Sequence, residues 1–267
     1  MTTPNIDDKG LPEHCLSLRV ASDWGHFRRV GRTATKQTYR MIPRTTVAGL
    51  LAAIVGEPRD SYYETFGEDV SAIAITPESE LRTINMPMTS VGTDPSEATT
   101  QTAGSRRSQL VRYQDTRAPR QIHVYETLVD PVYRLDVAVE DEEFYTQLRR
   151  HLKNGTSHYP PSLGLSEHLA RVELLNSSSE PTPVTGDEPV IIDAAVPGTL
   201  KNVVPQAGVE CVTERSAAVM EGIGGGRRTT RFDDLVFTPT PDTGVKVAPS
   251  ALDWPVASVG DKTVVFR

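Results

Sequence analysis

The order of apolar patterns along the chain restricts its fold more than any other feature of the sequence. Residues 16–21 alternate apolar and polar side chains, as in a half-buried strand. Apolar residues then recur at helical spacing over 47–55, and Gly56 and Pro58 follow them. Residues 70–75 form a short apolar run. The first part of the chain therefore predicts a strand, a helix and a second strand.

The same order of elements returns farther along the chain. Apolar side chains alternate with Arg134 and Asp136 over 133–139, which predicts a strand with one solvent-facing side. Residues 141–152 form a charged amphipathic helix that ends at Asn154-Gly155, and 169–175 predict a further strand. A repeated strand, helix and strand is the order of the split βαβ motif. We therefore expect an α+β fold with a ferredoxin-like, RRM-like core.

An insertion of about Pro87 to Arg120 separates the two halves of this core. It has little apolar periodicity, and residues 93–108 are rich in Thr, Ser, Gly and Gln. A segment of this composition is typical of a mobile loop, or of an arm that orders on binding.

The chain after Asn176 has a different character. Residues 177–183 form a polar segment typical of a linker. Short strand-like runs broken by Pro and Gly then follow, at 190–196, 200–204, 231–237 and 263–266. We expect a domain over 11–176 that carries the inserted arm at about 87–120, and a smaller C-terminal β region over 177–267.

The charge of the chain is unevenly distributed. The formal net charge is −7, which taken alone argues against a nucleic-acid partner. A basic island nevertheless covers residues 24–44, with no acidic residue after Asp23, and aromatic side chains are interleaved with its cations. Arg grips phosphate oxygens and stacks on bases, and aromatic rings stack on splayed single-stranded RNA. The candidate RNA-binding residues here are Trp24, His26, Phe27, Arg28, Arg29, Arg32, Lys36, Tyr39, Arg40 and Arg44. The alternative is a solvated loop without a partner.

Two weaker basic islands follow. The second ends the insertion, and the third is a Gly-rich segment, GIGGGRR, at 222–228. Consecutive glycines let backbone N–H groups approach a phosphate closely, although the segment lacks the GK[ST] ending of a nucleotide P-loop. The alternative for the second island is a surface arm without a partner, and the alternative for the third is a flexible surface turn. The candidate residues are Arg106, Arg107, Arg112 and Arg120, then Gly224, Gly225, Gly226, Arg227 and Arg228.

The sequence offers little to a metal or to a known catalytic motif. Cys15 and Cys211 lie far apart, and none of the six histidines pairs with a carboxylate or Cys at metal-ligand spacing. The apolar run at 47–55 is far too short to span a bilayer. We expect a cytoplasmic protein with no cofactor, no metal and no membrane partner.

Two other functions stay open at this point. A metal-independent endoribonuclease could use His26, Tyr39 and Lys36 as its base, acid and cation. Alternatively, the basic islands could serve protein partners in a generic folded protein.

Three stretches resemble a known family. Residues 23–28 are DWGHFR, residues 38–56 are TYRMIPRTTVAGLLAAIVG, and residues 159–169 are YPPSLGLSEHL. These resemble the CRISPR-associated RAMP-superfamily subunit that caps the 5′ handle of the guide RNA in type I Cascade complexes, and the type I-B branch is the most similar. The resemblance is strong over 15–56, fair around 158–175 and loose beyond.

This resemblance implies a ferredoxin-like core, a thumb-like arm at 87–120 and a smaller C-terminal β region. It also implies three partners, namely the crRNA 5′ handle, the neighbouring Cascade backbone subunit and the large subunit. Residues 24–44 would line the handle groove, and Gly49 would let its helix pack closely. In the type I-C branch the subunit also cuts precursor RNA, using a Tyr and an adjacent Lys-His pair. This chain has no such pair, because His26 follows Gly25 and His123 follows Ile122. We therefore expect a non-catalytic RNA-binding subunit rather than an enzyme.

Overall fold

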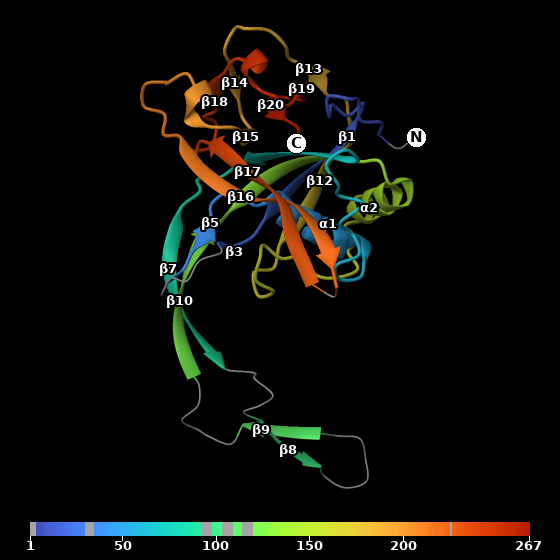
Figure 1. The fold of residues 1–267 in the computed structure, drawn as a ribbon, viewed down its shortest axis with the longest axis vertical. Helices are drawn as coiled ribbons and strands as arrows, with labels where there is room; N and C mark the ends of the chain where they lie inside the picture. Colours follow the sequence, from blue (N-terminus) through green and yellow to red (C-terminus); the bar gives the residue numbers. More distant parts are fainter. Residues whose placement is uncertain (1–3, 30–34, 92–97, 103–108, 114–119, 225) are drawn as a thin grey trace.

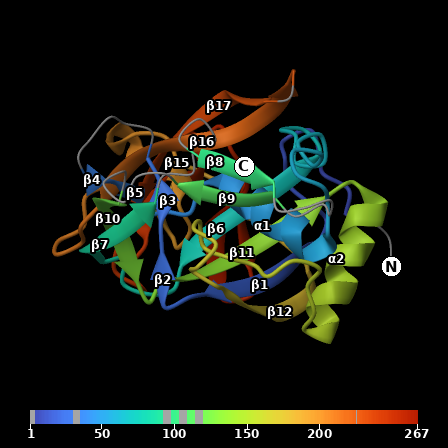
Figure 2. The ribbon, with the colours of Figure 1, turned by 90° about the horizontal axis from the view of Figure 1, so that it is seen from below.

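A four-stranded antiparallel sheet forms the centre of the molecule. The computed structural model describes residues 4–29, 35–91, 98–102, 109–113, 120–224 and 226–267. Neighbouring strands of the sheet follow the order β12-β1-β11-β6, and Figure 2 shows them in this order. The strands are β1 (Cys15–Ala21), β6 (Ser71–Pro77), β11 (Val132–Val139) and β12 (Arg171–Ser179).

Two helices connect these strands and cover one face of the sheet. Helix α1 (Arg44–Val55) lies between β1 and β6 in the chain, and α2 (Glu142–Asn154) lies between β11 and β12 (Figure 1). Gly56 ends α1 in the left-handed conformation, and Gly155 ends α2 in the same way. The Asp141 carboxylate caps α2 by accepting the Phe144 N–H at 3.0 Å. The predicted elements of the central sheet are thus confirmed in kind and order.

Apolar side chains of the sheet and helices form one core. It includes Leu16, Leu18 and Val20 of β1, and Leu51 and Ile54 of α1, all of them buried. The alternation in β1 and the helical spacing in α1 direct these side chains to the same interior. Gly49 of α1 faces Tyr62, whose hydroxyl lies 3.0 Å from where a Cβ would stand, so a side chain there would press on this ring.

The prediction that β11 has a solvent-facing side is wrong. Arg134 and Asp136 point away from the helices, but they are only 7% and 0% exposed. Strands of the C-terminal β region cover this face of the sheet (Figure 1). The Arg134 Nε lies 3.2 Å from Asp136 Oδ2, and Ser17 donates to the same carboxylate, so the buried charge is paired. The polar side chains of β11 therefore satisfy each other inside the protein.

The C-terminal β region is built of short strands and one long hairpin. Its strands are β13 (Thr182–Pro183), β14 (Val190–Ile192), β15 (Val196–Pro197), β16 (Val212–Ile223), β17 (Gly226–Phe237), β18 (Val245–Val247), β19 (Val256–Val259) and β20 (Lys262–Val265). Two short 3-10 helices, η2 (Leu200–Asn202) and η3 (Pro249–Ala251), interrupt them. A second apolar core joins this region to small side chains of the central sheet, among them Ala72, Ala74 and Ala138. The division at residue 176 into separately folding parts stays a prediction.

Two expectations for this region need correction. Residues 200–204 were expected to form a strand, but they hold the 3-10 helix η2, because Thr199 to Val203 turn with N–H groups donating three residues back. The expected linker at 177–183 is partly strand. Ser177 to Ser179 continue β12, and Ser179 pairs with Cys15 of β1. A polar composition was compatible with a strand here because Ser17 and Ser179 share a hydrogen bond in the interior.

The insertion forms a β-ribbon that leaves the body of the protein (Figure 1). Its strands β7 (Thr83–Val91) and β10 (Arg120–Val129) are antiparallel and pair from Thr83 with Leu128 to Val91 with Arg120. Farther along the insertion, β8 (Ala98–Thr102) and β9 (Gln109–Tyr113) form a second pair. The insertion is therefore longer than the predicted 87–120, and its described backbone is extended strand rather than loop.

Candidate nucleic-acid interface

The first basic island folds against the base of the β-ribbon. It contains the two-residue strands β2 (Trp24–Gly25), β3 (Phe27–Arg28), β4 (Thr35–Lys36) and β5 (Thr38–Tyr39). Strand β2 pairs antiparallel with β10, β4 pairs parallel with β10, and β3 pairs with β5. Two strands of the island are therefore hydrogen-bonded to β10, and this pairing joins the island to the root of the arm.

Glu126 of β10 fastens this island. Its Oε2 accepts the N–H of Thr38 at 3.1 Å, and its Oε1 accepts the hydroxyl of Thr83 at 3.2 Å. Its backbone carbonyl lies 2.8 Å from Nδ1 of His26. Glu214 holds the end of the island in a similar way. Its buried carboxylate accepts the N–H groups of Arg40 and Met41. Burial raises the pKa of Glu214, and these two donors act against that rise.

The island presents cations and aromatic rings together at the surface. Arg28 and Arg29 are exposed, and no carboxylate of the described residues lies within ion-pair distance of either one. The Arg29 guanidinium lies over the Tyr39 ring, 5.3 Å from its centroid. Trp24 is 36% exposed, while Lys36 and Arg40 are half-buried. These side chains match what a single-stranded RNA backbone and its bases require.

Three of the predicted residues of this island lie in the interior instead. Arg44 is 1% exposed, and His26 and Phe27 are each 2% exposed. Phe27 packs in the apolar core beside Tyr133. Side chains enclosed in this way do not form part of a contact surface, so we remove all three from the candidate interface.

Arg44 shows why a cation can be needed inside the protein. Its guanidinium donates to the backbone carbonyls of Arg267, Phe66, Ala218, Gly67 and Ser71, and to the Ser71 hydroxyl. Burial and the nearby Arg231 and Arg267 lower the pKa of Arg44 to about 9, so the group is still charged at neutral pH. Arg44 thereby ties α1 to distant backbone segments, and its own buried donors are satisfied.

His26 is enclosed as well, which bears on the ribonuclease alternative. Its ring meets the edge of Tyr125 at 5.1 Å, and its Nε2 is buried without a hydrogen-bond partner among the described residues. Burial lowers the pKa of His26, and the positive charge of Arg28 acts in the same direction. An enclosed imidazole with a lowered pKa is a weaker base and is poorly placed to take a proton from a surface-bound ribose. The expectation that the chain is not an enzyme stays a prediction.

The loop at 158–170 holds the island from the other side. The N–H of His26 donates to the Leu163 carbonyl at 3.0 Å. Gly164 has φ +93°, and a Cβ there would stand 1.8 Å from the His26 carbonyl oxygen. The loop is also tied to α1, because the N–H groups of His158 and Tyr159 donate to carbonyls near its C-terminus. This loop therefore connects α1 with the first island.

A groove of about 270 Å³ lies between this loop, α1 and the β16–β17 hairpin. Thr45, Thr46 and Ser162 supply hydroxyl groups to its lining, and Arg227 of the third island supplies a guanidinium. Arg227 lies 3.9 Å from Asp60, and Arg228 is ion-paired with Glu221 on the facing strand. The structure thus brings one cation of the third island next to the loop that supports the first.

The glycines of the third island form the turn of a hairpin. Ile223 and Gly226 are paired across it, Gly224 has φ +51°, and Gly225 lies outside the described residues. No heavy atom lies within 4 Å of where a Cβ of Gly224 would stand. Glycine is needed here for the backbone angle. A role in phosphate binding stays a prediction.

Several predicted residues fall where the structure describes no side chain. Arg32 in the first island, and Arg106 and Arg107 in the second, lie outside the described residues. Arg112 lies in β9 and Arg120 in β10, and only their backbone is described. The second island therefore stays a prediction.

Part of this surface was not predicted from the sequence. The predicted insertion ended at Arg120 and no strand was predicted for 121–129, although polar and apolar residues alternate from Gln121 to Val124. That alternation was the available signal for β10. His123 and Tyr125 are half-buried residues of β10, next to the pairing with β4 of the island. They belong to the candidate interface.

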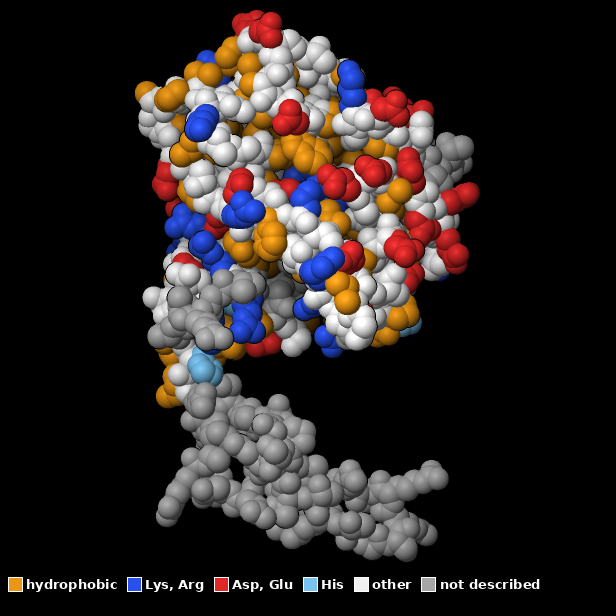
Figure 3. All heavy atoms as spheres, in the orientation of Figure 1, with side chains coloured by type: hydrophobic (Ala, Val, Ile, Leu, Met, Phe, Trp, Pro, Cys, Tyr) orange, Lys and Arg blue, Asp and Glu red, His pale blue; other side chains and the backbone are white. Residues whose placement is uncertain are grey.

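Charged side chains are unevenly spread over the face of the molecule in Figure 3. Figure 3 shows Lys and Arg side chains near the root of the β-ribbon, and Asp and Glu side chains on the side of α2. This separation explains how a chain of net charge −7 can still offer a basic surface.

Within the described ranges, no three His, Cys, Asp or Glu side chains are arranged to hold a metal ion. The described helices include none with the length and apolar character needed to cross a membrane.

Comparison with known proteins places the chain in a family. The model of the family described as CRISPR-associated protein (Cas_Cas5) matches residues 15–213. No curated protein matches the chain in sequence. A solved chain of a CRISPR RNA-guided surveillance complex is 17% identical with a TM-score of 0.52, and the match covers 87% of this chain and 91% of that one. A CRISPR protein from Archaeoglobus fulgidus is 15% identical with a TM-score of 0.45, over 95% of this chain and 99% of its own. The family match spans most of the chain, and the chain therefore belongs to the Cas5 family of CRISPR-associated proteins.

Proposed function

We propose that this chain is a guide-RNA-binding subunit of a CRISPR effector complex, and that it holds the 5′ handle of the crRNA in a type I, I-B-like Cascade. The family assignment and the fold shared with a chain of an RNA-guided surveillance complex support a place in such a complex. The resemblance of residues 23–56 and 159–169 supports the handle and the I-B branch. The other subunits and the crRNA would be its partners, in the cytoplasm.

The strand order β12-β1-β11-β6, with α1 and α2 as crossovers, supports a ferredoxin-like split βαβ core for this proposal. In that arrangement the β7–β10 ribbon would serve as the thumb-like arm, since it is inserted between β6 and β11.

The observation that carries the proposal is the exposed pair Arg28 and Arg29, with Arg29 over the Tyr39 ring, at the root of the arm, where Trp24 is also exposed. Both guanidinium groups are exposed without an acidic partner among the described residues, so they keep their charge free for phosphate. The aromatic rings beside them would stack on unpaired bases.

The test is binding of the purified chain to 5′-handle RNA and to a scrambled RNA of equal length across a salt series. We expect tighter binding to the handle. Removal of two phosphate contacts in Arg28→Ala/Arg29→Ala should lower the slope of log affinity against log salt by about 1.4. The matched control is Arg150→Ala/Lys153→Ala, which removes two exposed charges from α2. Equal slopes for both double variants would contradict the assignment of this surface.

A further inference from the structure

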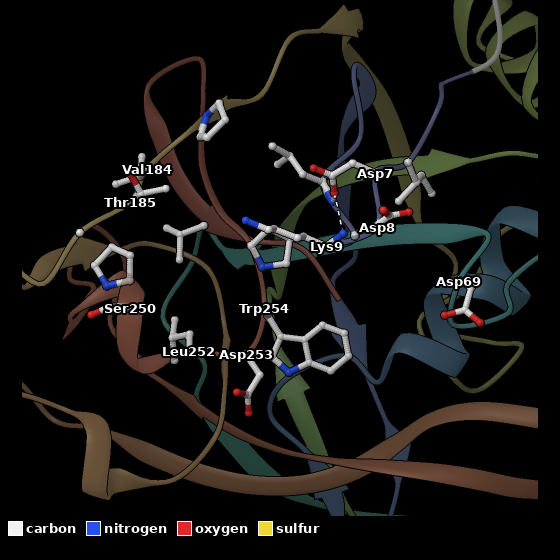
Figure 4. Close-up of a pocket in the computed structure, with 18 of the residues that line it drawn as sticks. Asp7, Asp8, Lys9, Asp69, Val184, Thr185, Ser250, Leu252, Asp253 and Trp254 are labelled. Atoms are coloured by element: carbon white, nitrogen blue, oxygen red, sulfur yellow. Dashed lines mark hydrogen bonds between the residues drawn. The ribbon is translucent and has the colours of Figure 1, made fainter.

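A groove larger than the one beside the 158–170 loop lies away from the basic island. It has a volume of about 1050 Å³ and runs between the N-terminal segment, the loop before β6, the segment after β13 and the segment around η3 (Figure 4). A groove of this size exceeds what one small polar ligand fills. Nothing in the proposed RNA contacts uses it.

The floor of the groove is apolar. Trp254 lies at its centre, with the indole turned into the groove (Figure 4). The Arg231 guanidinium lies over this ring, 4.9 Å from its centroid, and pairs with Glu68. Leu11 and Leu252 also contribute to the lining. A half-buried Trp beside aliphatic side chains is typical of a surface that receives an apolar side chain.

The rim of the groove is acidic. Five carboxylates and one ammonium line it, belonging to Asp7, Asp8, Glu68, Asp69, Asp253 and Lys9. Glu68 is paired with Arg231, and Asp7 accepts the N–H groups of Lys9 and Leu11. Asp8, Asp69 and Asp253 are exposed, and none forms an ion pair with a described residue. The three unpaired carboxylates make the groove attractive to cations.

The apolar floor and the acidic rim together favour one class of ligand. RNA is excluded, because its phosphates would meet the acidic rim. A divalent ion is not favoured, because the described carboxylates do not converge in threes. A cation with no apolar part would leave the Trp254 floor uncovered.

We propose that this groove binds an extended basic segment of a protein partner, in which Arg or Lys alternates with aliphatic residues. The aliphatic side chains cover Trp254 and Leu252, while the cations meet Asp8, Asp69 and Asp253. The proposal goes beyond the RNA-binding function and does not depend on it, because the two surfaces differ in residues and in charge.

The test uses a short fluorescein-labelled peptide in which Arg and Leu alternate, with fluorescence anisotropy as the readout. Two comparison peptides carry Glu in place of Arg, or Ser in place of Leu. The test variant is Asp69→Asn/Asp253→Asn, which keeps the size of both exposed side chains. The control variant is Glu80→Gln/Glu210→Gln, since both residues are exposed and lie outside the groove.

We expect salt-sensitive binding of the Arg–Leu peptide, and weaker binding of both comparison peptides. The Asp69/Asp253 variant should weaken binding by at least about fivefold, and the control variant should leave it unchanged. Equal affinity of the wild type and the groove variant would overturn the proposal. So would equal affinity for the Arg–Leu and Glu–Leu peptides, since the rim would then not select cations.

Discussion

At the scale of single residues, the sharpest requirement concerns Gly164. The loop at 158–170 can reach the first basic island only because no side chain separates Gly164 from the His26 carbonyl. Gly155, at the end of α2, also has positive φ, but nothing lies within 4 Å of where its Cβ would stand. The two glycines therefore separate the cost of backbone strain from the cost of a steric clash.

We predict that Gly164→Ala lowers the free energy of unfolding by at least about 3 kcal/mol, since strain and overpacking add there. Gly155→Ala should cost only about 1 kcal/mol, because strain acts alone. Chemical denaturation of both variants gives the two values. Equal losses would mean that the loop moves away from His26 without cost.

Two buried histidines make the stability of the fold dependent on pH. Burial is the main cause that lowers the pKa of His26 and of His168, and each ring has a buried nitrogen without a partner among the described residues. Below the ordinary histidine value of 6.5 the unfolded chain therefore binds more protons than the folded one. Stability contributed by the neutral rings is present above that value and is lost as the pH falls.

We predict a fall in the free energy of unfolding between about pH 7.5 and about pH 5.5. His168→Gln should reduce the pH dependence, because the glutamine does not titrate. The control is His158→Gln, which changes an exposed histidine of the same loop. A slope unchanged by His168→Gln would show that other groups cause the fall.

Residue types were easier to predict from the sequence than their burial. The basic island at 24–44 was visible as a cluster of cations and rings, and Arg28, Arg29 and Tyr39 do lie together at the surface. Arg44 belongs to the same basic stretch, yet it enters the core because carbonyls from three separate segments of the chain converge on it. That convergence depends on tertiary contacts, which local sequence does not contain.

At the scale of elements, the arm is the part that the sequence described least well. Composition suggested a loop, because residues 93–108 are rich in Thr, Ser, Gly and Gln and show little apolar periodicity. The strands of the central sheet were found because each has a buried face, as in the alternation of β1. The polar positions of β11 were misjudged for a related reason, since the region that covers them lies far away in the chain.

The register of the ribbon allows a clean deletion. Val91 and Arg120 are paired across β7 and β10, so residues 92–119 can be replaced by an Asn-Gly turn. We predict that stability stays within about 0.5 kcal/mol, since the turn joins two residues that are already paired and leaves the rest of β7 and β10 unchanged. The salt slope of RNA binding should fall by up to about 2.8, because Arg106, Arg107, Arg112 and Arg117 are lost.

The control for this deletion keeps the arm and changes the same four arginines to glutamine. If the arm acts through phosphate contacts, the two variants should have the same salt slope. A normal slope in the glutamine variant would mean that the arm binds RNA through other groups, or not at all.

At the scale of the whole molecule, the surface is divided by charge. The basic island and the root of the arm form one part, and the acidic groove around Trp254 belongs to another. Such a division suits a subunit that holds RNA on one side and a protein on the other. It also explains why the net charge of −7 is a poor guide to the binding partners, since it describes neither the basic nor the acidic surface.

The central claim is that RNA lies on the surface formed by residues 24–40 and the 158–170 loop. The most direct measurement is photocrosslinking of thiouridine-substituted handle RNA to the chain, with the attached residues identified by mass spectrometry. The account predicts crosslinks to Trp24, Tyr39 and Tyr159, which are exposed or half-buried aromatic side chains of this surface. Crosslinks confined to the acidic groove, or equal crosslinking of scrambled RNA, would contradict it.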